Sequence, residues 1–213
     1  MRRRSLLARA RAEVDAYLSL GSNLGDRDQH LRRGISELDA HQRITVAGVS
    51  GVYETEPVGG VEQDRYFNLV LHVRTDLPPR ELLAACQRVE AVQGRDREHE
   101  QRWGPRPLDV DIVLYGDLEV DEDDLTIPHA RLHERAFVLV PLMEVHPGGT
   151  LPDGTRLSKL VTRLAPIEGV ALAHRYEGMP GGGPGRPAGP GSPAAIPAED
   201  WEPPRGAPPG TER

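Results

Sequence analysis

Two carboxylates, Asp109 and Asp111, begin an apolar and largely β-branched run that continues to Tyr115. A short apolar run of this kind is typical of a buried strand. Since side chains alternate along a strand, both carboxylates face the same side and Val110 faces the other. Two carboxylates spaced ~7 Å apart on one face can hold hard divalent cations.

Arginines gather just before this carboxylate pair, at positions Arg95, Arg97, Arg102 and Arg106. A guanidinium group contacts phosphate through two parallel hydrogen bonds, which a lysine cannot do. Carboxylates for magnesium beside guanidinium groups for phosphate are what phosphoryl transfer from a nucleotide requires. A simpler alternative is that the carboxylates pair with these arginines and bind no metal.

The segment from Arg102 to Val113 reads Arg-Trp-Gly-Pro-Arg-Pro-Leu-Asp-Val-Asp-Ile-Val. It resembles, without a gap, the signature of the 6-hydroxymethyl-7,8-dihydropterin pyrophosphokinases of folate biosynthesis. The resemblance continues in matching order through most of the chain. It implies an enzyme that moves the β,γ-pyrophosphoryl unit of ATP onto the hydroxymethyl group of a reduced pterin and releases AMP.

The resemblance also implies roles for individual residues. Asp109 and Asp111 match the carboxylates that hold a pair of magnesium ions on the triphosphate. The matching catalytic arginines are Arg95, Arg97 and Arg106, and the matching nucleotide contacts are Gln87, Glu90, Trp103, Ile112, His129 and Arg135. The matching pterin contacts are Thr55, Val58, Tyr66, Asn68 and Phe137.

Several of these residues have plainer explanations that remain open. Phe137 fits ordinary core packing equally well, and Gln87 and Glu90 fit a solvated helix face. Arg97 fits a solvated loop charge among glutamates. Asn68 is different, because a polar amide among apolar strand residues needs partners if it is buried.

Two other function classes are compatible with parts of the sequence. A kinase acting on another small alcohol would share the carboxylates and arginines but would not need Asn68 and Phe137. A ferredoxin-like RNA-binding module would need exposed aromatic residues in basic surroundings. The chain has only nine aromatic residues and a net charge of −7, which argues against a nucleic-acid binder.

The elements that would position these residues follow from hydrophobic periodicity. We predict strands over residues 16–20, 44–53, 66–73 and 110–115, and helices over 28–38, 134–143 and 157–164. A further helix, between the third and fourth of these strands, is opened by Pro78 and Pro79 and closed by Gly94. The first six elements run strand–helix–strand–strand–helix–strand. This order predicts an α+β fold with a ferredoxin-like split βαβ sheet, helices packed on it and a small C-terminal extension. The acidic run 117–124 is most simply a solvated hairpin tip.

The sequence predicts one domain over residues 14–175, preceded by an N-terminal extension over 1–13. Residues 176–213 are rich in proline and glycine and predict a disordered tail. The single cysteine, Cys86, forms no disulfide framework, which fits a reducing cytoplasm. We expect a monomer that binds neither nucleic acid nor membrane, and an association with other folate-pathway enzymes is compatible with the chain.

Overall fold

The computed structural model describes residues 12–57, 63–97 and 104–178. Residues 1–11 of the predicted N-terminal extension and the predicted tail from residue 179 onward lie outside these ranges. So do Val58, Arg102 and Trp103 among the candidate site residues.

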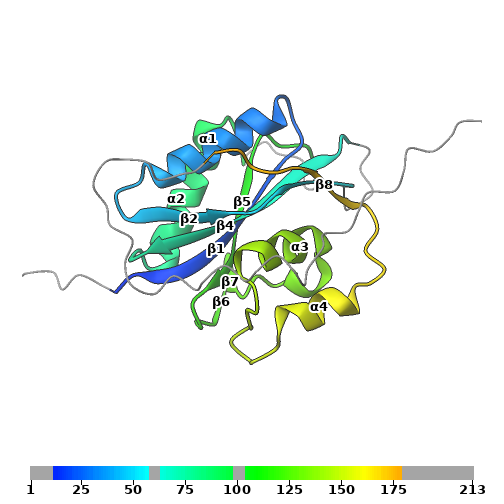
Figure 1. Ribbon diagram of the computed structural model, residues 1–213. Helices are drawn as coiled ribbons and strands as arrows, with labels where there is room; N and C mark the ends of the chain where they lie inside the picture. The colour runs from blue at the N-terminus through cyan, green and yellow to red at the C-terminus, as the bar shows by residue number, and fades with distance from the viewer. Residues whose placement is uncertain (1–11, 58–62, 98–103, 179–213) are drawn as a thin grey trace, which may run out of the picture.

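An antiparallel sheet forms the centre of the molecule (Figure 1). Its strands lie in the order β5-β1-β4-β3-β8, and β2 pairs with β4 as well. The strands are β1 (Val14–Ser22), β2 (Ile44–Val49), β3 (Val52–Thr55), β4 (Tyr66–Thr75), β5 (Asp109–Tyr115) and β8 (Val170–His174). The four predicted strands are present, but the prediction of one strand over 44–53 is wrong, because it divides into β2 and β3.

The division between β2 and β3 has a local cause. Ser50 turns its hydroxyl into the ladder, where Oγ accepts the Val70 amide at 2.9 Å while the Ser50 amide donates to the Val70 carbonyl at 3.0 Å. Gly51 then lies so close to β8 that a Cβ there would sit 2.5 Å from a methyl carbon of Leu172. The two strands therefore follow the same edge of β4 with a break between them.

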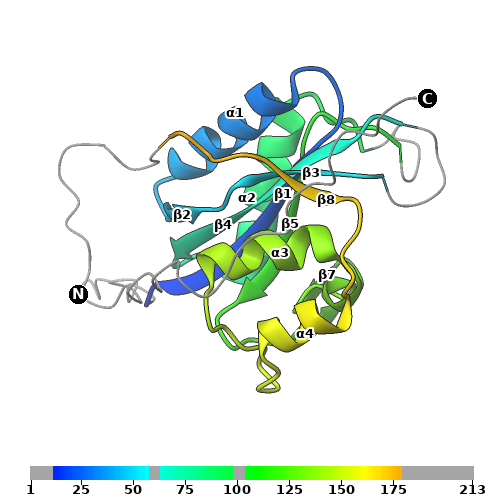
Figure 2. The same cartoon turned by 45° about the vertical axis from the view of Figure 1, so that its right-hand side comes forward.

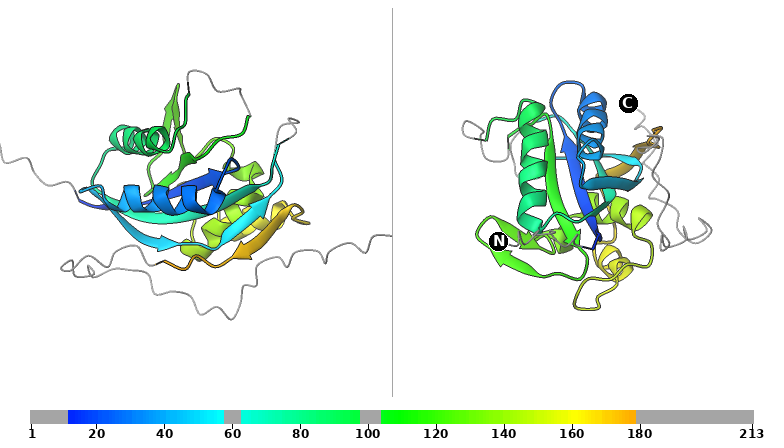
Figure 3. Two further views of the ribbon diagram at one scale, coloured as in Figure 1. Left: turned by 90° about the horizontal axis from the view of Figure 1, so that it is seen from above. Right: turned by 90° about the vertical axis from the view of Figure 1, so that its left-hand side faces the viewer.

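Two helices cover one face of the sheet, and Figures 1 and 3 show them side by side. These are α1 (Arg27–Asp39) and α2 (Pro79–Val92). Leu31, Ile35 and Leu38 recur at helical spacing in α1 and pack on alternate residues of β1 and β4. Asp26 caps α1 by accepting the Gln29 amide at 3.0 Å, and Pro79 begins α2.

The opposite face carries α3 (Ala136–Val145) and α4 (Leu157–Arg163), with the short 3-10 helix η1 (Leu132–Glu134) before α3. Figure 2 shows α3 lying directly beneath the sheet with α4 below it. A second apolar cluster fills this interface and includes Tyr17, Val70, Leu139 and Leu157. The predicted helix over 134–143 therefore begins later, at Ala136, after a 3-10 turn. The acidic run and the residues directly after it form a small hairpin of β6 (Val120–Glu122) and β7 (Leu125–Ile127).

The last described residues cross the α1 side of the molecule. Tyr176 packs against the core cluster beneath α1, and Arg32 of α1 donates to the Glu177 carbonyl at 3.3 Å. The molecule is thus a mixed α+β fold whose antiparallel sheet is covered on both faces. No helix in the described part of the chain is long and apolar enough to cross a membrane.

Candidate active site

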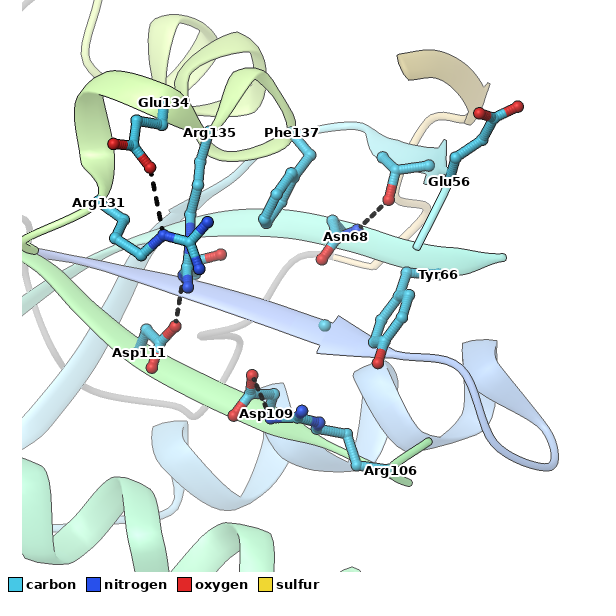
Figure 4. A pocket seen from close by; sticks show the side chains of 13 residues that line it. Glu56, Tyr66, Asn68, Arg106, Asp109, Asp111, Arg131, Glu134, Arg135 and Phe137 are labelled. Carbon is cyan, nitrogen blue, oxygen red and sulfur yellow. Dashed lines mark hydrogen bonds and ion pairs between the residues drawn. The ribbon is translucent and has the colours of Figure 1, made fainter. Parts of the chain in front are cut away.

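One pocket opens on the α3 face of the sheet, where β1, β4 and β5 meet η1 and the start of α3 (Figure 4). The space between its walls is about 790 Å³ including its open side. Its lining residues are Ser19, Gly21, Thr55, Glu56, Tyr66, Asn68, Arg106, Asp109, Asp111, Arg131, Glu134, Arg135 and Phe137. Eight of the residues singled out in the sequence lie in this wall.

Asp109 and Asp111 occupy the β5 side of the pocket, each with its own cationic partners. Arg95 pairs with Asp109, and Arg106 Nη1 reaches the other oxygen of the same carboxylate at 3.1 Å. Arg135 Nη1 donates to Asp111 Oδ2 at 3.1 Å. The alternation predicted for β5 is confirmed, since both carboxylates line the pocket while Val110 packs into the opposite core.

The two carboxyl groups differ in acidity because their neighbours differ. Burial would raise the pKa of Asp109, but Arg95 and Arg106 outweigh burial and hold this pKa below its usual range. Burial raises the pKa of Asp111, and the nearby Asp109 charge raises it further against the opposing effect of His129 and Arg135. Paired carboxylates with unequal basicity are frequent at functional sites.

Glu90 connects α2 to the start of β5 from behind the pocket. Its side chain is only 1% exposed, and Oε1 accepts both the Val110 amide at 2.8 Å and Arg95 Nη1 at 2.6 Å. Arg97 Nε donates to the other oxygen at 3.0 Å. Glu90 is therefore a buried anchor for both loop arginines, rather than a solvated helix residue.

Asn68 forms the floor at the other end of the pocket. Its Nδ2 donates to Thr55 Oγ1 at 2.6 Å, which gives one N–H of the buried amide a partner. Tyr66 and Phe137 stand on either side of this floor in Figure 4. Gly21 permits this position of the amide, because a Cβ there would sit 2.7 Å from Asn68 Oδ1 and would force the side chain to shift.

His129 lies beside the Asp111 end of the pocket. Its Nδ1 accepts the Arg131 amide at 3.1 Å, so the neutral ring carries its proton on Nε2. Nε2 faces Asp111 Oδ2 at 3.7 Å and Arg135 Nη1 at 3.4 Å. Burial lowers the pKa of His129 and outweighs the opposing effect of Asp111.

Six described residues that the sequence predicted are not part of the pocket wall: Gln87, Glu90, Arg95, Arg97, Ile112 and His129. Glu90, Arg95, Arg97 and His129 contact one another or the two carboxylates, as given above, whereas Ile112 and Gln87 do not. The Ile112 side chain lies in the core between the sheet and the two helices α1 and α2. Gln87 is half-buried on α2 and does not line the pocket. The sequence interpretation missed five lining residues: Ser19, Gly21, Glu56, Arg131 and Glu134. Strand alternation alone could have found Ser19 and Gly21, which share the face opposite Leu18 and Leu20.

Paired carboxylates and arginines in one pocket have the chemistry to bind a polyphosphate together with a divalent cation. The family model described as 7,8-dihydro-6-hydroxymethylpterin-pyrophosphokinase (HPPK) matches residues 17–147. The chain belongs to this family.

Curated relatives from bacteria agree with this assignment. The chain is 45% identical over 130 residues to the 2-amino-4-hydroxy-6-hydroxymethyldihydropteridine pyrophosphokinase of Bacillus subtilis. The aligned region covers 61% of this chain and 77% of that protein. It is 43% identical to the protein of the same name from Methylorubrum extorquens, over 71% of this chain and 94% of that protein. It also matches the bifunctional protein FolKE of Lactococcus lactis at 46% identity, but spans only 36% of that protein.

The fold is similar to that of solved HPPK-DHPS structures. The wild-type Plasmodium falciparum HPPK-DHPS with pteroate superposes with a TM-score of 0.57 at 15% identity, over 74% of this chain and 43% of that one. At this level of identity the likeness supports the fold alone.

Proposed function

We propose that the pocket on the α3 face is the active centre of this pyrophosphokinase. The reaction transfers pyrophosphate from ATP to the hydroxymethyl group of 6-hydroxymethyl-7,8-dihydropterin in folate biosynthesis. The hydroxyl oxygen of the pterin loses its proton to solvent and forms a bond to the β-phosphorus. The bond between that phosphorus and the oxygen bridging it to the α-phosphate breaks, and AMP leaves with that oxygen. The observation that carries the location is that Asp109 and Asp111 share one pocket with cationic side chains and with the Asn68 floor.

The carboxylates suit magnesium. Both are hard oxygen donors, and magnesium is commonly bound by one or two carboxylates together with substrate phosphates. Among the described residues, no group of three or more His, Cys, Asp or Glu side chains could hold a metal ion by itself. We therefore propose that two Mg²⁺ ions bind Asp109 and Asp111 only together with ATP. Magnesium supplies charge neutralisation on the phosphates when bound.

The arginines then have an exchange role. Arg95 and Arg106 pair with Asp109 in the free protein, and Arg135 pairs with Asp111. Magnesium on these carboxylates would weaken their attraction for the guanidinium groups, and the arginines would then be available to phosphate oxygens. Glu90 retains Arg95 and Arg97 near the pocket during this exchange, because its carboxylate is buried beneath both.

The pterin half of the proposal rests on Asn68, Thr55, Tyr66 and Phe137. A flat heterocycle with a donor and acceptor edge needs aromatic faces and a few fixed polar groups. Asn68 has its amide orientation set by Thr55, which leaves Oδ1 and an N–H for a ligand. Val58 is proposed for the same site and lies outside the described residues.

The nucleotide half extends toward His129. We propose nucleotide contacts from His129 and Arg135, with Gln87, Glu90 and Ile112 contributing from α2 and β5. The Ile112 side chain is in the core, so only its backbone is available for a contact. Trp103 remains a prediction outside the described residues.

Some coarser expectations accompany this function. The strand order β5-β1-β4-β3 supports a ferredoxin-like description of the sheet, with β8 added at the edge. We expect a monomer in the cytoplasm. Physical association with other folate enzymes is supported by relatives in which a matching region belongs to a longer protein, such as FolKE and HPPK-DHPS.

Product analysis tests the reaction. Incubating the protein with ATP, magnesium and 6-hydroxymethyl-7,8-dihydropterin should form AMP and the pterin diphosphate in equal amounts. Formation of ADP would indicate a simple kinase instead. Calorimetry with a non-hydrolysable ATP analogue should show binding that needs magnesium. If the protein bound a single-stranded RNA but neither the ATP analogue nor the pterin, it would be a nucleic-acid-binding module instead.

A further inference from the structure

Arg131 reaches into the pocket, although neither the sequence signature nor strand alternation pointed to it. It is the residue before η1, and its side chain lies beside Arg135 above Asp111 (Figure 4). Its Nε donates to Glu134 Oε2 at 3.3 Å, one 3-10 turn further on. Arg131 and Glu134 thus form the rim of the pocket at the end opposite Asn68.

The backbone of Arg131 is held firmly. Its amide donates to His129 Nδ1 at 3.1 Å, and its carbonyl accepts the Glu134 amide at 3.1 Å. The pair between the Arg131 and Glu134 side chains is much weaker, because these side chains are 38% and 68% exposed. Exposed ion pairs of this kind contribute at most about 1 kcal/mol. The backbone of Arg131 is therefore held in place, whereas its guanidinium group can change partners.

The order of groups along the pocket shows what that partner would be. Asn68 and Tyr66 lie at one end, Asp109 lies between the ends, and Asp111 lies at the other end beneath Arg131 (Figure 4). A substrate pair that spans the pocket with its pterin on Asn68 brings the nucleotide side of the reacting phosphates to the Arg131 end. Arg135 already pairs with Asp111 there, so Arg131 adds a second cation at this end.

We propose that Arg131 binds the α-phosphate of the nucleotide, the phosphate that leaves in AMP, and that Glu134 is its resting partner in the free protein. This inference rests on the proposed location of the active centre. Arg131 exchanges an exposed carboxylate for a phosphate, with which its planar fork forms a bidentate contact. As the leaving phosphate gains negative charge during transfer, the guanidinium group stabilises it.

The test compares Arg131→Ala and Arg131→Lys with Arg163→Ala, an exposed arginine on α4 that does not line the pocket. Calorimetry measures three ligands: AMP, a non-hydrolysable ATP analogue with magnesium, and 6-hydroxymethyl-7,8-dihydropterin alone. Arg131→Ala should weaken AMP and the analogue about ten-fold, which corresponds to the loss of one charge-assisted contact of about 1.4 kcal/mol. Pterin affinity should stay at the wild-type value, Arg131→Lys should lose less, and Arg163→Ala should lose nothing.

Glu134→Gln provides the matched test of the resting pair. This variant should bind AMP as tightly as the wild-type protein or more tightly, because the Arg131 guanidinium group no longer has to break an ion pair with Glu134 before it binds phosphate. A loss as large as that of Arg131→Ala would overturn the role given to Glu134.

Other outcomes separate this inference from the proposed function. Unchanged AMP affinity in Arg131→Ala, or equal weakening of AMP and pterin, would overturn the α-phosphate assignment while the wild-type protein still bound both substrates. Weakening of the analogue without weakening of AMP would place Arg131 on the β- or γ-phosphate and also overturn it. If the wild-type protein bound neither substrate, the proposed function itself would fail. Melting temperatures of all variants, with Arg131→Lys as the milder change, show whether a loss reflects misfolding.

Discussion

Asn68 Nδ2 donates a 2.6 Å hydrogen bond to Thr55 Oγ1, and the two residues lie on the neighbouring strands β4 and β3. This bond fixes the rotation of the Asn68 amide, so that its oxygen lies against Gly21 of β1. Three strands thus cooperate to hold one polar group at the floor of the pocket. The floor is therefore a property of the sheet and not of any single loop.

Asn68→Leu tests whether this amide recognises the pterin. The substitution should leave binding of an ATP analogue intact while weakening the pterin by roughly 1–3 kcal/mol, since a polar edge would be buried without a partner. Calorimetry with both ligands measures the difference. Equal loss of affinity for both ligands would indicate that Asn68 acts only in folding. Unchanged affinity for the pterin would show that the pterin does not bind at this strand.

Gly21→Ala tests the close approach between β1 and β4. Its Cβ would lie 2.7 Å from Asn68 Oδ1, so the amide must move away from its bond with Thr55. We expect overpacking to cost roughly 1–3 kcal/mol of unfolding free energy, with a parallel loss of pterin affinity. Denaturant unfolding and calorimetry measure the two effects. Gly48→Ala on β2, which does not line the pocket, is the control and should retain pterin binding, because an added Cβ there would meet its nearest neighbour at 3.6 Å. Wild-type stability in Gly21→Ala would contradict the contact.

The strongly periodic elements and the carboxylate pair could be predicted from sequence, because local alternation determines them. Asp109 and Asp111 lie on one face and Val110 on the other, because side chains alternate between the two faces of a strand. β8 could not be predicted, since Val170–His174 has few buried side chains and pairs only through its tertiary contact with β3. The break at Ser50 likewise depends on Val70, which is distant in sequence.

The site shows a similar division. Residues inside the signature segment, such as Arg106, could be assigned to a pocket because the segment itself is specific. Arg131 and Glu134 were not found, because the segment before α3 has no periodicity and only its path across the sheet brings it to the pocket. The alternative that placed Glu90 on a solvated helix face is excluded by contacts that the helix pattern does not contain, because its partners Val110 and Arg95 come from later in the chain.

Asp109→Ala and Asp111→Ala test the proposed magnesium site. Each variant should keep its fold and lose nearly all turnover, by roughly 10²–10³-fold for a lost transition-state contact of ~3–4 kcal/mol. Steady-state rates with magnesium, together with circular dichroism, measure this. Asp121→Ala on β6, which does not line the pocket, is the control and should turn over normally. A near wild-type rate in either carboxylate variant would exclude the assignment.

Glu90→Gln tests the buried anchor of the loop arginines. The amide can still accept the Val110 N–H, but Arg95, which is 6% exposed, loses the charge of Glu90 and keeps that of Asp109. We expect a loss of roughly 1–3 kcal/mol in unfolding free energy. Arg97→Gln is the matched control, because Arg97 is half exposed and contributes at most about 1 kcal/mol through the same carboxylate. Equal losses in the two variants would mean that burial of Arg95 does not matter.

His146 should make the protein less stable in mild acid. Burial lowers the pKa of His146 in the folded state, and the nearby His72 lowers it further against the opposing effect of Asp15. Below the ordinary pKa of about 6.5, the unfolded chain therefore binds a proton that the folded protein does not. The free energy of unfolding should fall as the pH drops below this value, by up to about 1.4 kcal/mol per pH unit for one proton.

His146→Asn isolates this contribution, because the asparagine can still pair with Tyr17, whose hydroxyl lies 2.8 Å from His146 Nδ1. Urea unfolding between about pH 7 and 5 should show a shallower decline in the variant than in the wild-type protein. The buried His129 contributes with the same sign in both proteins, so the difference between the two curves belongs to His146. His133→Asn, which changes an exposed histidine, should follow the wild-type curve. Parallel curves for His146→Asn and the wild-type protein would show that His146 takes up its proton in the folded state as readily as in the unfolded one.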